Sequence, residues 1–285
     1  MSIWKGIFLG IIQGLSEFLP ISSSGHLKLF QHLFGIKEDN LFITVMLHVG
    51  TLVAVFIVYH SLIGKMIIEF FKSIKDIFTG KFKFNEMNME RRMMVMVIIS
   101  TALLGIMVVP VFGGNSLKDY IERLNNCESI IPLGFAFLIT GLLLIITFII
   151  TKKMGKKRQN AKVKDALIIG AAQCVATVSG ISRSGSTVAA GLLCGLNREY
   201  MVQYSFILSI PVIIASALSE GKDAIAVGIN VEIMPLIFGV IAALISGIAA
   251  IKFIEWLIKK DRYNLFGYYC GALGILTIIL GICGV

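Results

Sequence analysis

The stretch EFLPISSSGH, residues 17–26, carries far more polar chemistry than the apolar sequence around it. It contains Glu17, three consecutive serines and His26, most of which a helix in lipid avoids. Ionisable side chains at membrane depth are costly, so they usually mark a functional site. Histidine is suited to act as a base near neutral pH, and Ser23 is placed either to cap a helix or to take part in the chemistry. We therefore predict a site at Glu17, Ser23 and His26.

A second polar stretch, SGISRSGST at 179–187, adds an arginine and further serines. The guanidinium of Arg183 is a planar fork of donors that suits phosphate. Helix N-termini and glycine-permitted tight turns bind anions through backbone N–H groups. The two stretches together predict a site for a phosphate or diphosphate. Gln13 lies four residues before Glu17, on the same helix face. The residues expected to bind this ligand are Gln13, Ser22, Ser24, Gly25, Ser182, Ser184 and Gly185.

The composition is that of an integral membrane protein. Of the 285 residues, 56% are hydrophobic and 15% are charged, and the mean hydropathy is +0.87. The net charge of +9 does not indicate a nucleic-acid partner, because Lys and Arg cluster in short loops between apolar runs. The five cysteines show no metal-ligand spacing, so we expect them to be small packing residues.

Six apolar segments are long enough to cross a bilayer, which takes about 20 residues. Two further apolar regions, 1–35 and 165–196, are interrupted by the polar stretches described above. The predicted spans are Leu41–Tyr59, Met93–Phe112, Ile130–Ile150, Met201–Ser219, Ile233–Ile254 and Leu265–Cys283.

The loop charges predict the orientation. Seven Lys and Arg residues lie in 60–92, seven in 151–164 and four in 252–262, against two in 113–129 and one in 220–232. Loops rich in Lys and Arg stay in the cytoplasm. Six spans satisfy this rule only if each interrupted region enters and leaves the membrane on the same side. The fold class predicted is an all-α polytopic membrane protein with six transmembrane helices, two re-entrant helical hairpins and both termini outside.

The two interrupted regions repeat each other. At a constant offset of 160, eight identities align without a gap. Three predicted spans lie between the copies, so the copies have opposite orientations. In inverted repeats, broken helices from the two halves meet near the midplane and form the site. We predict one membrane domain, 1–285, with repeats of about 1–112 and 161–285 joined through the span 130–150. The matching pairs are Gly10/Gly170, Gln13/Gln173, Ile21/Ile181, Ser22/Ser182, Ser24/Ser184, Gly25/Gly185, Leu33/Leu193 and Gly35/Gly195.

At these residues the sequence resembles the undecaprenyl-diphosphate phosphatase family, also called bacitracin-resistance proteins. QGLSEFLPISSSGH at 13–26 is similar to the family's Glu/Gln-x-x-x-Glu segment followed by Pro-x-Ser-Ser-Ser/Thr-Gly-His. SGISRSGST resembles its Pro-Gly-x-Ser-Arg-Ser-Gly motif, and YSFILSIP at 204–211 resembles a further signature. The likeness covers essentially the whole chain. It departs at Ser179, where the family usually has Pro, and at Gln13, where some members have Glu.

The resemblance implies hydrolysis of undecaprenyl diphosphate to undecaprenyl phosphate and inorganic phosphate. This reaction recycles the lipid carrier for peptidoglycan and other cell-wall polymers, and it confers bacitracin resistance. The resemblance also implies that Ser23 is the nucleophile, His26 its base or acid, and Arg183 the clamp on phosphate. Glu17 would hold a divalent cation, Mg²⁺ or Ca²⁺, or assist proton transfer. Gln13 in place of Glu puts a two-carboxylate metal site in question. The implied location is the bacterial cell membrane, with the site opening outside.

Two alternatives stay open. His26 is a second candidate for the attacking group, with Ser23 only binding the phosphate. An inverted repeat is also typical of a transporter or flippase, here for an anionic polyprenyl lipid. The expected partners are a polyprenyl diphosphate lipid and the bilayer, without nucleic acid. The sequence leaves the oligomeric state open, a homodimer included.

Overall fold

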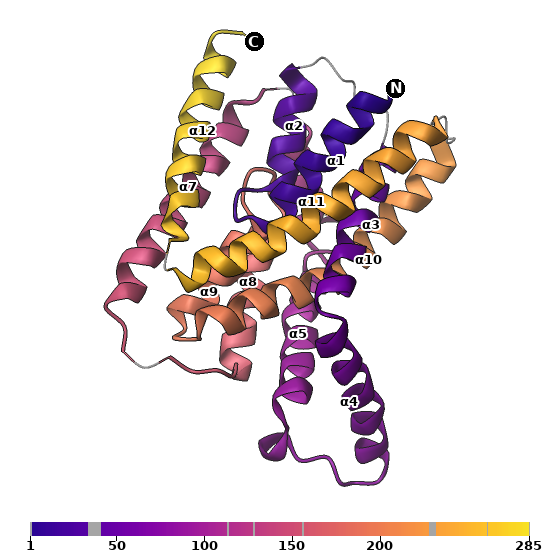
Figure 1. Ribbon diagram of the computed structural model, residues 1–285, viewed down its shortest axis with the longest axis vertical. Coiled ribbons are helices and arrows are strands. Elements are labelled where there is room, and N and C mark those ends of the chain that lie inside the picture. Colours follow the sequence, from indigo (N-terminus) through magenta and orange to yellow (C-terminus); the bar gives the residue numbers. More distant parts are fainter. Residues whose placement is uncertain are drawn as a thin grey trace.

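The computed structural model is built almost entirely of helices (Figure 1). It describes residues 2–33, 41–112, 114–127, 129–155, 157–227, 232–260 and 262–284. Helices are the expected outcome for long apolar runs, because a helix satisfies its own backbone hydrogen bonds without water. The α-helices are α1 (Ile3–Phe18), α2 (Ser23–Leu33), α3 (Leu41–Val58), α4 (His60–Phe78), α5 (Met89–Ile106), α6 (Leu117–Asn125), α7 (Ile131–Lys152), α8 (Val163–Val175), α9 (Arg183–Leu193), α10 (Arg198–Val227), α11 (Ile233–Lys259) and α12 (Asn264–Ile282); a 3₁₀ turn η1 (Phe84–Glu86) and two short strands, β1 (Pro110–Phe112) and β2 (Asn115–Ser116), complete the described elements.

Four of these helices, α7, α10, α11 and α12, are long and apolar enough to cross a membrane. A fifth candidate is α3 taken together with α4, although the two are bent by 86° at their junction. Five of the six predicted spans therefore correspond to α3, α7, α10, α11 and α12, and α10 and α11 extend beyond their predicted ends. The chain has the helices of a multi-pass membrane protein.

The predicted span Met93–Phe112 differs from the observed helix at both ends. Its helix, α5, begins at Met89 with charged residues in its first turn and is not among the candidate spans of the described chain. The helix ends at Ile106, and Pro110–Phe112 forms strand β1 instead, antiparallel to β2. Pro110 has no N–H to extend a helix, and Gly114 adopts a φ of +84° that suits the turn between the strands.

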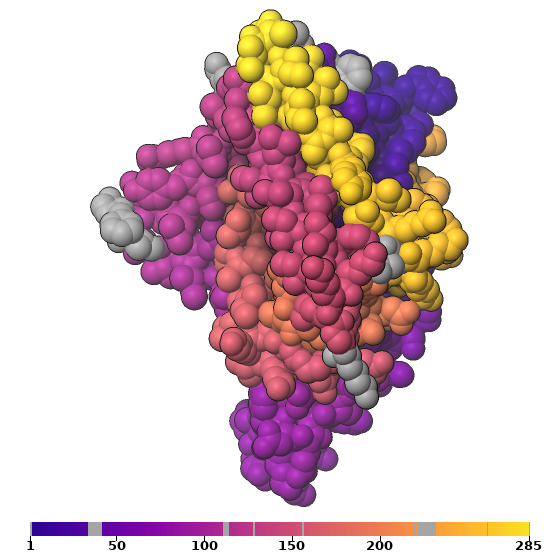
Figure 2. Space-filling model, turned by 90° about the vertical axis from the view of Figure 1, so that its left-hand side faces the viewer, coloured from indigo at the N-terminus to yellow at the C-terminus, as the bar shows by residue number. Residues whose placement is uncertain are grey.

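Region 60–92, predicted as a cytoplasmic loop, contains the helix α4. Its apolar residues recur at helical spacing, and α4 buries Ile63 and Met66 in the main core cluster. Arg91 of α5 then ties the two helices together through Glu69 at 2.9 Å and Asp76 at 2.7 Å. Figures 1 and 2 show the lower part of this α4–α5 hairpin projecting from the rest of the molecule.

Small residues allow close packing between helices in the body. A Cβ added to Gly10 of α1 would collide with the carbonyl of Gly239 on α11, and one added to Gly14 would collide with Ser246. Glycines one turn apart let helices in a membrane approach closely. The same kind of contact, Gly141 against Gly267, brings α7 alongside α12 (Figures 1 and 2). The close contact with α11 fixes the helix that carries Glu17 near its end.

The two interrupted regions of the sequence form two helical hairpins. The first consists of α1 and α2, and the second of α8 and α9. Residues 34 and 35, the predicted end of the first hairpin, lie outside the described residues. The two tips, 19–22 and 176–182, overlap the polar stretches that opened the sequence analysis, and the hairpins contact each other there in the interior.

Candidate active site

The first tip is a strained turn that the second tip helps to hold. Ser22 has a φ of +71°, in the left-handed region that a non-glycine residue seldom adopts. Its hydroxyl accepts hydrogen bonds from the backbone N–H of Gly25 at 3.3 Å and of Gly180 at 3.2 Å. The first of these bonds lies within the opening turn of α2, and the second comes from the other hairpin. The turn thus depends on both halves of the chain.

The second tip is held by its own serines and by α7. Ser182 caps α9, because its hydroxyl accepts from the N–H of Gly185 at 3.1 Å. The N–H of Ser182 donates to the hydroxyl of Thr140 on α7 at 3.1 Å. The hydroxyl of Ser184 donates to the carbonyl of Leu19 in the first tip at 3.1 Å. These contacts place the next side chain, that of Arg183, beside the end of α1.

Glu17 is the centre of the resulting cluster. Its side chain is buried, and its Oε2 accepts hydrogen bonds from Ser23 Oγ at 2.6 Å and from Gln13 Nε2 at 2.9 Å. Arg183 forms an ion pair and a hydrogen bond with Oε1. His48 Nε2 lies 3.7 Å from Oε2. A buried carboxylate needs this density of donors to offset the loss of water.

The cluster is also suited to a bound anion. Helices α2 and α9 both begin here, and the positive ends of their dipoles point at the same region. A guanidinium has five N–H donors in all, and the Arg183 side chain, which is 18% exposed, uses one of its nitrogens on Glu17. Ser23 is also partly exposed. A phosphate that reached Ser23 would therefore meet an activated hydroxyl and a guanidinium together.

His26 does not pair with Ser23 in the described structure. Its Nδ1 lies 2.7 Å from the carbonyl oxygen of Ser22, and its Nε2 lies 2.8 Å from the hydroxyl of Tyr269 on α12. The ring of Phe137 packs edge-on against the imidazole, with the centroids 5.3 Å apart. Both ring nitrogens are thus occupied, and the acceptor of the Ser23 proton is Glu17.

The remaining predicted ligand residues lie at the tips in different environments. Ser24 is exposed, with its hydroxyl 3.5 Å from that of Ser22, and Gly25 packs tightly against Phe137. Gly185 lies next to Pro20 and Ser182. Gln13, Ser22, Ser182 and Ser184 use their side chains on protein partners. The structure brings all of these residues together, and their phosphate-binding roles stay predictions.

The sequence analysis missed the brace on the second tip. Asn125, the last residue of α6, accepts from the N–H of Ser179 at 2.8 Å and donates to the carbonyl of Thr177 at 3.1 Å. Lys28 of α2 donates to the carbonyls of Asn125 and Cys127. Ser179 stands where the resembled family usually has Pro, which has no N–H to donate. In this chain a hydrogen bond therefore steadies a turn that proline would otherwise stiffen.

The helix that presents Asn125 is capped at its start. The hydroxyl of Ser116 accepts from the N–H of Asp119, and the Asp119 carboxylate accepts from Ser116 in return. The hydrogen bonds from the backbone N–H and then the hydroxyl of Ser116 hold the pKa of Asp119 below its usual range. The motif SLKD was readable in the sequence, whereas nothing local marked Asn125 as a contact of the second tip.

The donor set fits a divalent cation only together with a phosphate ligand. The described residues contain no group of three or more His, Cys, Asp or Glu side chains that could hold a metal. Gln13 Oε1, however, is buried beside Glu17 without a hydrogen-bond partner in the described chain. Mg²⁺ is typically held by one or two carboxylates and substrate phosphates, and Ca²⁺ also takes amide oxygens. Glu17 and Gln13 therefore supply part of an oxygen ligand set.

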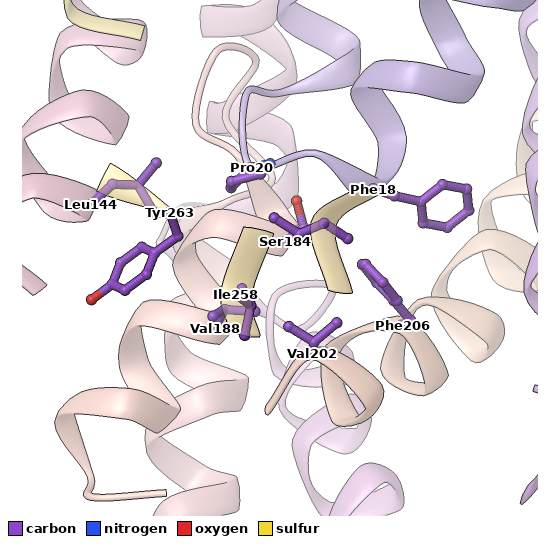
Figure 3. Close-up of a pocket in the computed structure, with 10 residues that line it drawn as sticks. Phe18, Pro20, Leu144, Ser184, Val188, Val202, Phe206, Ile258 and Tyr263 are labelled. Carbon is purple, nitrogen blue, oxygen red and sulfur yellow. The ribbon is translucent and has the colours of Figure 1, made fainter. Parts of the chain in front are cut away.

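A pocket lined in part by the two hairpins is apolar. Figure 3 shows it with Pro20 and Phe18 of the first hairpin and Ser184 of the second at one side, and with Val202 of α10 and Ile258 of α11 opposite them. Its lining is built mainly of hydrocarbon, which gives a phosphate no charged partner. The polar cluster around Glu17, and not this pocket, is the candidate active site.

Comparison with known proteins gives matches over nearly the whole chain. A family model described as bacitracin resistance protein BacA matches residues 6–276. An undecaprenyl-diphosphatase of Halothermothrix orenii is 40% identical over 282 residues, which cover 98% of each chain. The undecaprenyl-diphosphatase of Alkaliphilus metalliredigens is 40% identical over 288 residues, covering 99% of this chain and 100% of the relative. That of Methanosphaera stadtmanae is 40% identical over 286 residues, covering 99% of each. These matches include both hairpins.

Proposed function

The chain belongs to the bacitracin resistance protein BacA family, and from this premise we propose that the Glu17 cluster hydrolyses undecaprenyl diphosphate to undecaprenyl phosphate and inorganic phosphate. The predicted family resemblance is thereby confirmed. The reaction returns the lipid carrier to the synthesis of peptidoglycan and other cell-wall polymers, and it confers bacitracin resistance.

The observation that carries the mechanism is the 2.6 Å hydrogen bond from Ser23 Oγ to Glu17 Oε2. The Ser23 oxygen attacks the terminal phosphorus while its proton passes to Glu17. The bond from this phosphorus to the bridging oxygen breaks, and undecaprenyl phosphate leaves. A water molecule then attacks the phosphoserine and its oxygen bonds to phosphorus, while the bond from phosphorus to the Ser23 oxygen breaks. The proton held by Glu17 returns to the Ser23 oxygen, and the water protons leave with the inorganic phosphate.

Arg183 and the two helix N-termini supply the charge neutralisation that phosphoryl transfer needs. His26 remains the second candidate for the attacking group. The geometry favours Ser23, because its hydroxyl already has a carboxylate acceptor, whereas both nitrogens of His26 are hydrogen-bonded elsewhere.

A divalent cation, Mg²⁺ or Ca²⁺, forms part of the proposal. Glu17 would hold it together with oxygens of the diphosphate and with Gln13 Oε1, which has no hydrogen-bond partner among the described residues. Such an ion neutralises part of the diphosphate charge when it is bound. The role of Glu17 as acceptor of the Ser23 proton rests on the hydrogen bond alone.

The membrane arrangement is likewise proposed: six spans, two re-entrant hairpins and inverted repeats with both termini outside. Packing between helices of the two halves supports the repeat. Helix α1 of the first half packs along α11 of the second, and α8, the counterpart of α1, packs along α5 of the first half. Helix α3 packs against α10. The contact of α7 with α12 is consistent with this pattern and supports α7 as the counterpart of α12. The first repeat would then continue through α7, beyond the predicted end at residue 112.

The proposed site opens to the outside of the bacterial cell membrane. Support comes from the charged loops, which place the first hairpin on the outer side, and from the position of Glu17, Ser23 and His26 on that hairpin. A vesicle of known orientation, with substrate in both leaflets, tests the opening. Phosphate released only on the side of the Lys-rich loops would show that the site opens to the cytoplasm.

The direct test of the function is phosphate release from undecaprenyl diphosphate by the purified protein in detergent. We expect turnover by the wild type and a loss of about 10³-fold or more in Ser23→Ala, as when a nucleophile is removed. Ser61→Ala, an exposed serine on α4, is the matched control and should keep full activity. A wild-type protein that releases no phosphate would contradict the function, whereas an active Ser23→Ala would contradict only the nucleophile.

A further inference from the structure

The environment of His26 fixes its tautomer. The carbonyl oxygen of Ser22 can only accept a hydrogen bond, so the Nδ1 that lies 2.7 Å from it carries the proton in the neutral ring. Nε2 is then left with a lone pair. The Tyr269 hydroxyl, 2.8 Å away, is the group that donates to it. The tautomer follows from these two partners.

The orientation of the ring depends on the same tyrosine. The rings of His26 and Tyr269 are nearly parallel, at 7°, with their centroids 5.7 Å apart, while Phe137 closes the edge of the imidazole. His26 is 4% exposed, whereas Tyr269 is 45% exposed. The tyrosine therefore joins a buried imidazole to the surface of the molecule.

The tyrosine comes from the far end of the chain. Tyr269 lies on α12, and 243 positions separate it from His26. Its neighbour Cys270 contacts the same tip, with its sulfur 3.7 Å from the carbonyl oxygen of Pro20. Two adjacent residues of α12 thus touch the first hairpin, one at the turn and one at the imidazole.

We infer that Tyr269 is a positioning residue of the active site, which acts through His26. Its hydroxyl holds the imidazole with Nε2 directed at the phenol, so that Nδ1–H stays on the carbonyl of Ser22 and braces the strained turn next to Ser23. The inference deepens the proposed function and rests on it for its kinetic consequence. The assignment of the tautomer depends only on the two hydrogen-bond partners of the imidazole and not on the proposed function. Ser23 and Glu17 form one hydrogen-bonded unit, and His26 and Tyr269 form a second.

The kinetic experiment compares Tyr269→Phe with Tyr268→Phe. The first removes only the hydroxyl and keeps the ring, and the second makes the same change at an adjacent tyrosine that is 59% exposed. We expect Tyr269→Phe to lower kcat by about 10- to 100-fold with KM little changed. Tyr268→Phe should match the wild type. A kcat within about twofold of wild type for Tyr269→Phe would overturn the inference.

A double variant separates positioning from general damage. Because Tyr269 acts through His26, adding Tyr269→Phe to His26→Ala should cost nothing more than His26→Ala alone. Losses that multiply would show that the hydroxyl acts independently of the imidazole and would refute the inference.

A nitrogen-15 NMR measurement tests the inference without measuring enzymatic turnover. The nitrogen-15 shifts of the labelled imidazole report which ring nitrogen carries the proton. We expect the Nδ1–H tautomer for His26 in the wild type. In Tyr269→Phe we expect the Nε2 resonance to shift, because its lone pair loses the hydrogen bond from the phenol. An Nε2–H tautomer in the wild type, or an unchanged Nε2 resonance in the variant, would overturn the inference. If the wild type released no phosphate but showed the expected tautomer, the proposed function would fail while the positioning held.

Discussion

Replacing Arg183 with lysine keeps the positive charge but removes the planar guanidinium group with its several N–H donors. In the structure the guanidinium holds Glu17 with one nitrogen, and its other nitrogens make no hydrogen bond to the described residues, which leaves donors for a phosphate. Lysine offers a single ammonium group, which cannot make the same planar contact with both partners. The fold should survive, because the buried Glu17 keeps a cation beside it.

The expected loss follows from one missing charge-assisted hydrogen bond. Such a bond is worth about 1.5–3 kcal/mol, so kcat/KM should fall by about 10- to 160-fold. Arg183→Ala should lose more, since it also leaves Glu17 as an unpaired buried charge.

The assay is phosphate release from undecaprenyl diphosphate in detergent, with melting temperatures recorded for each variant. Arg123→Lys, an exposed arginine of α6, is the control and should stay at the wild-type rate. If Arg183→Lys kept its activity within about threefold of wild type, less than 1 kcal/mol, the guanidinium would not be a clamp on the phosphate.

Four further outcomes are expected. Ser23→Ala should still bind the lipid diphosphate at equilibrium although its turnover is lost; near-normal turnover would favour His26 as the attacking group. Asn125→Ala removes two hydrogen bonds to the second tip, each worth about 0.5–1.5 kcal/mol, and should lower both the melting temperature and kcat; unchanged values would show that the brace is dispensable. A cysteine in place of Lys118 should react with an impermeant maleimide in intact cells, while one in place of Lys153 should not, in a protein without its native cysteines, and the reverse pattern would invert the orientation. Overexpression should raise bacitracin resistance, and the Ser23→Ala variant should not; an equal gain from both would point to sequestration of the lipid instead of hydrolysis.

Several helices could be predicted from the sequence, because membrane-spanning helices are recognisable by their length and hydropathy. The segments that form α7, α11 and α12 are predominantly apolar, and a helix satisfies their backbone hydrogen bonds in lipid. Helix α4 was not predicted, because Lys, Glu and Asp interrupt its apolar residues. Its hydropathy is therefore too low for a membrane span, and the segment was assigned to a loop. These charged side chains find partners on α5, whose Arg91 pairs with Glu69 and Asp76 across the interface.

Within the site, the sequence by itself determined which residue types gather at the tips. Gln13 and Glu17 are one helical turn apart, and serine is typical of helix N-termini, so these features depend on local spacing alone. Only the tertiary structure decided their partners. Ser23 faces Glu17 instead of His26, His26 meets Tyr269 from the last helix, and Asn125 holds Ser179 from 54 positions away. Such contacts depend on the angles at which the helices cross and on the strained turn at Ser22, which no periodicity in the chain encodes.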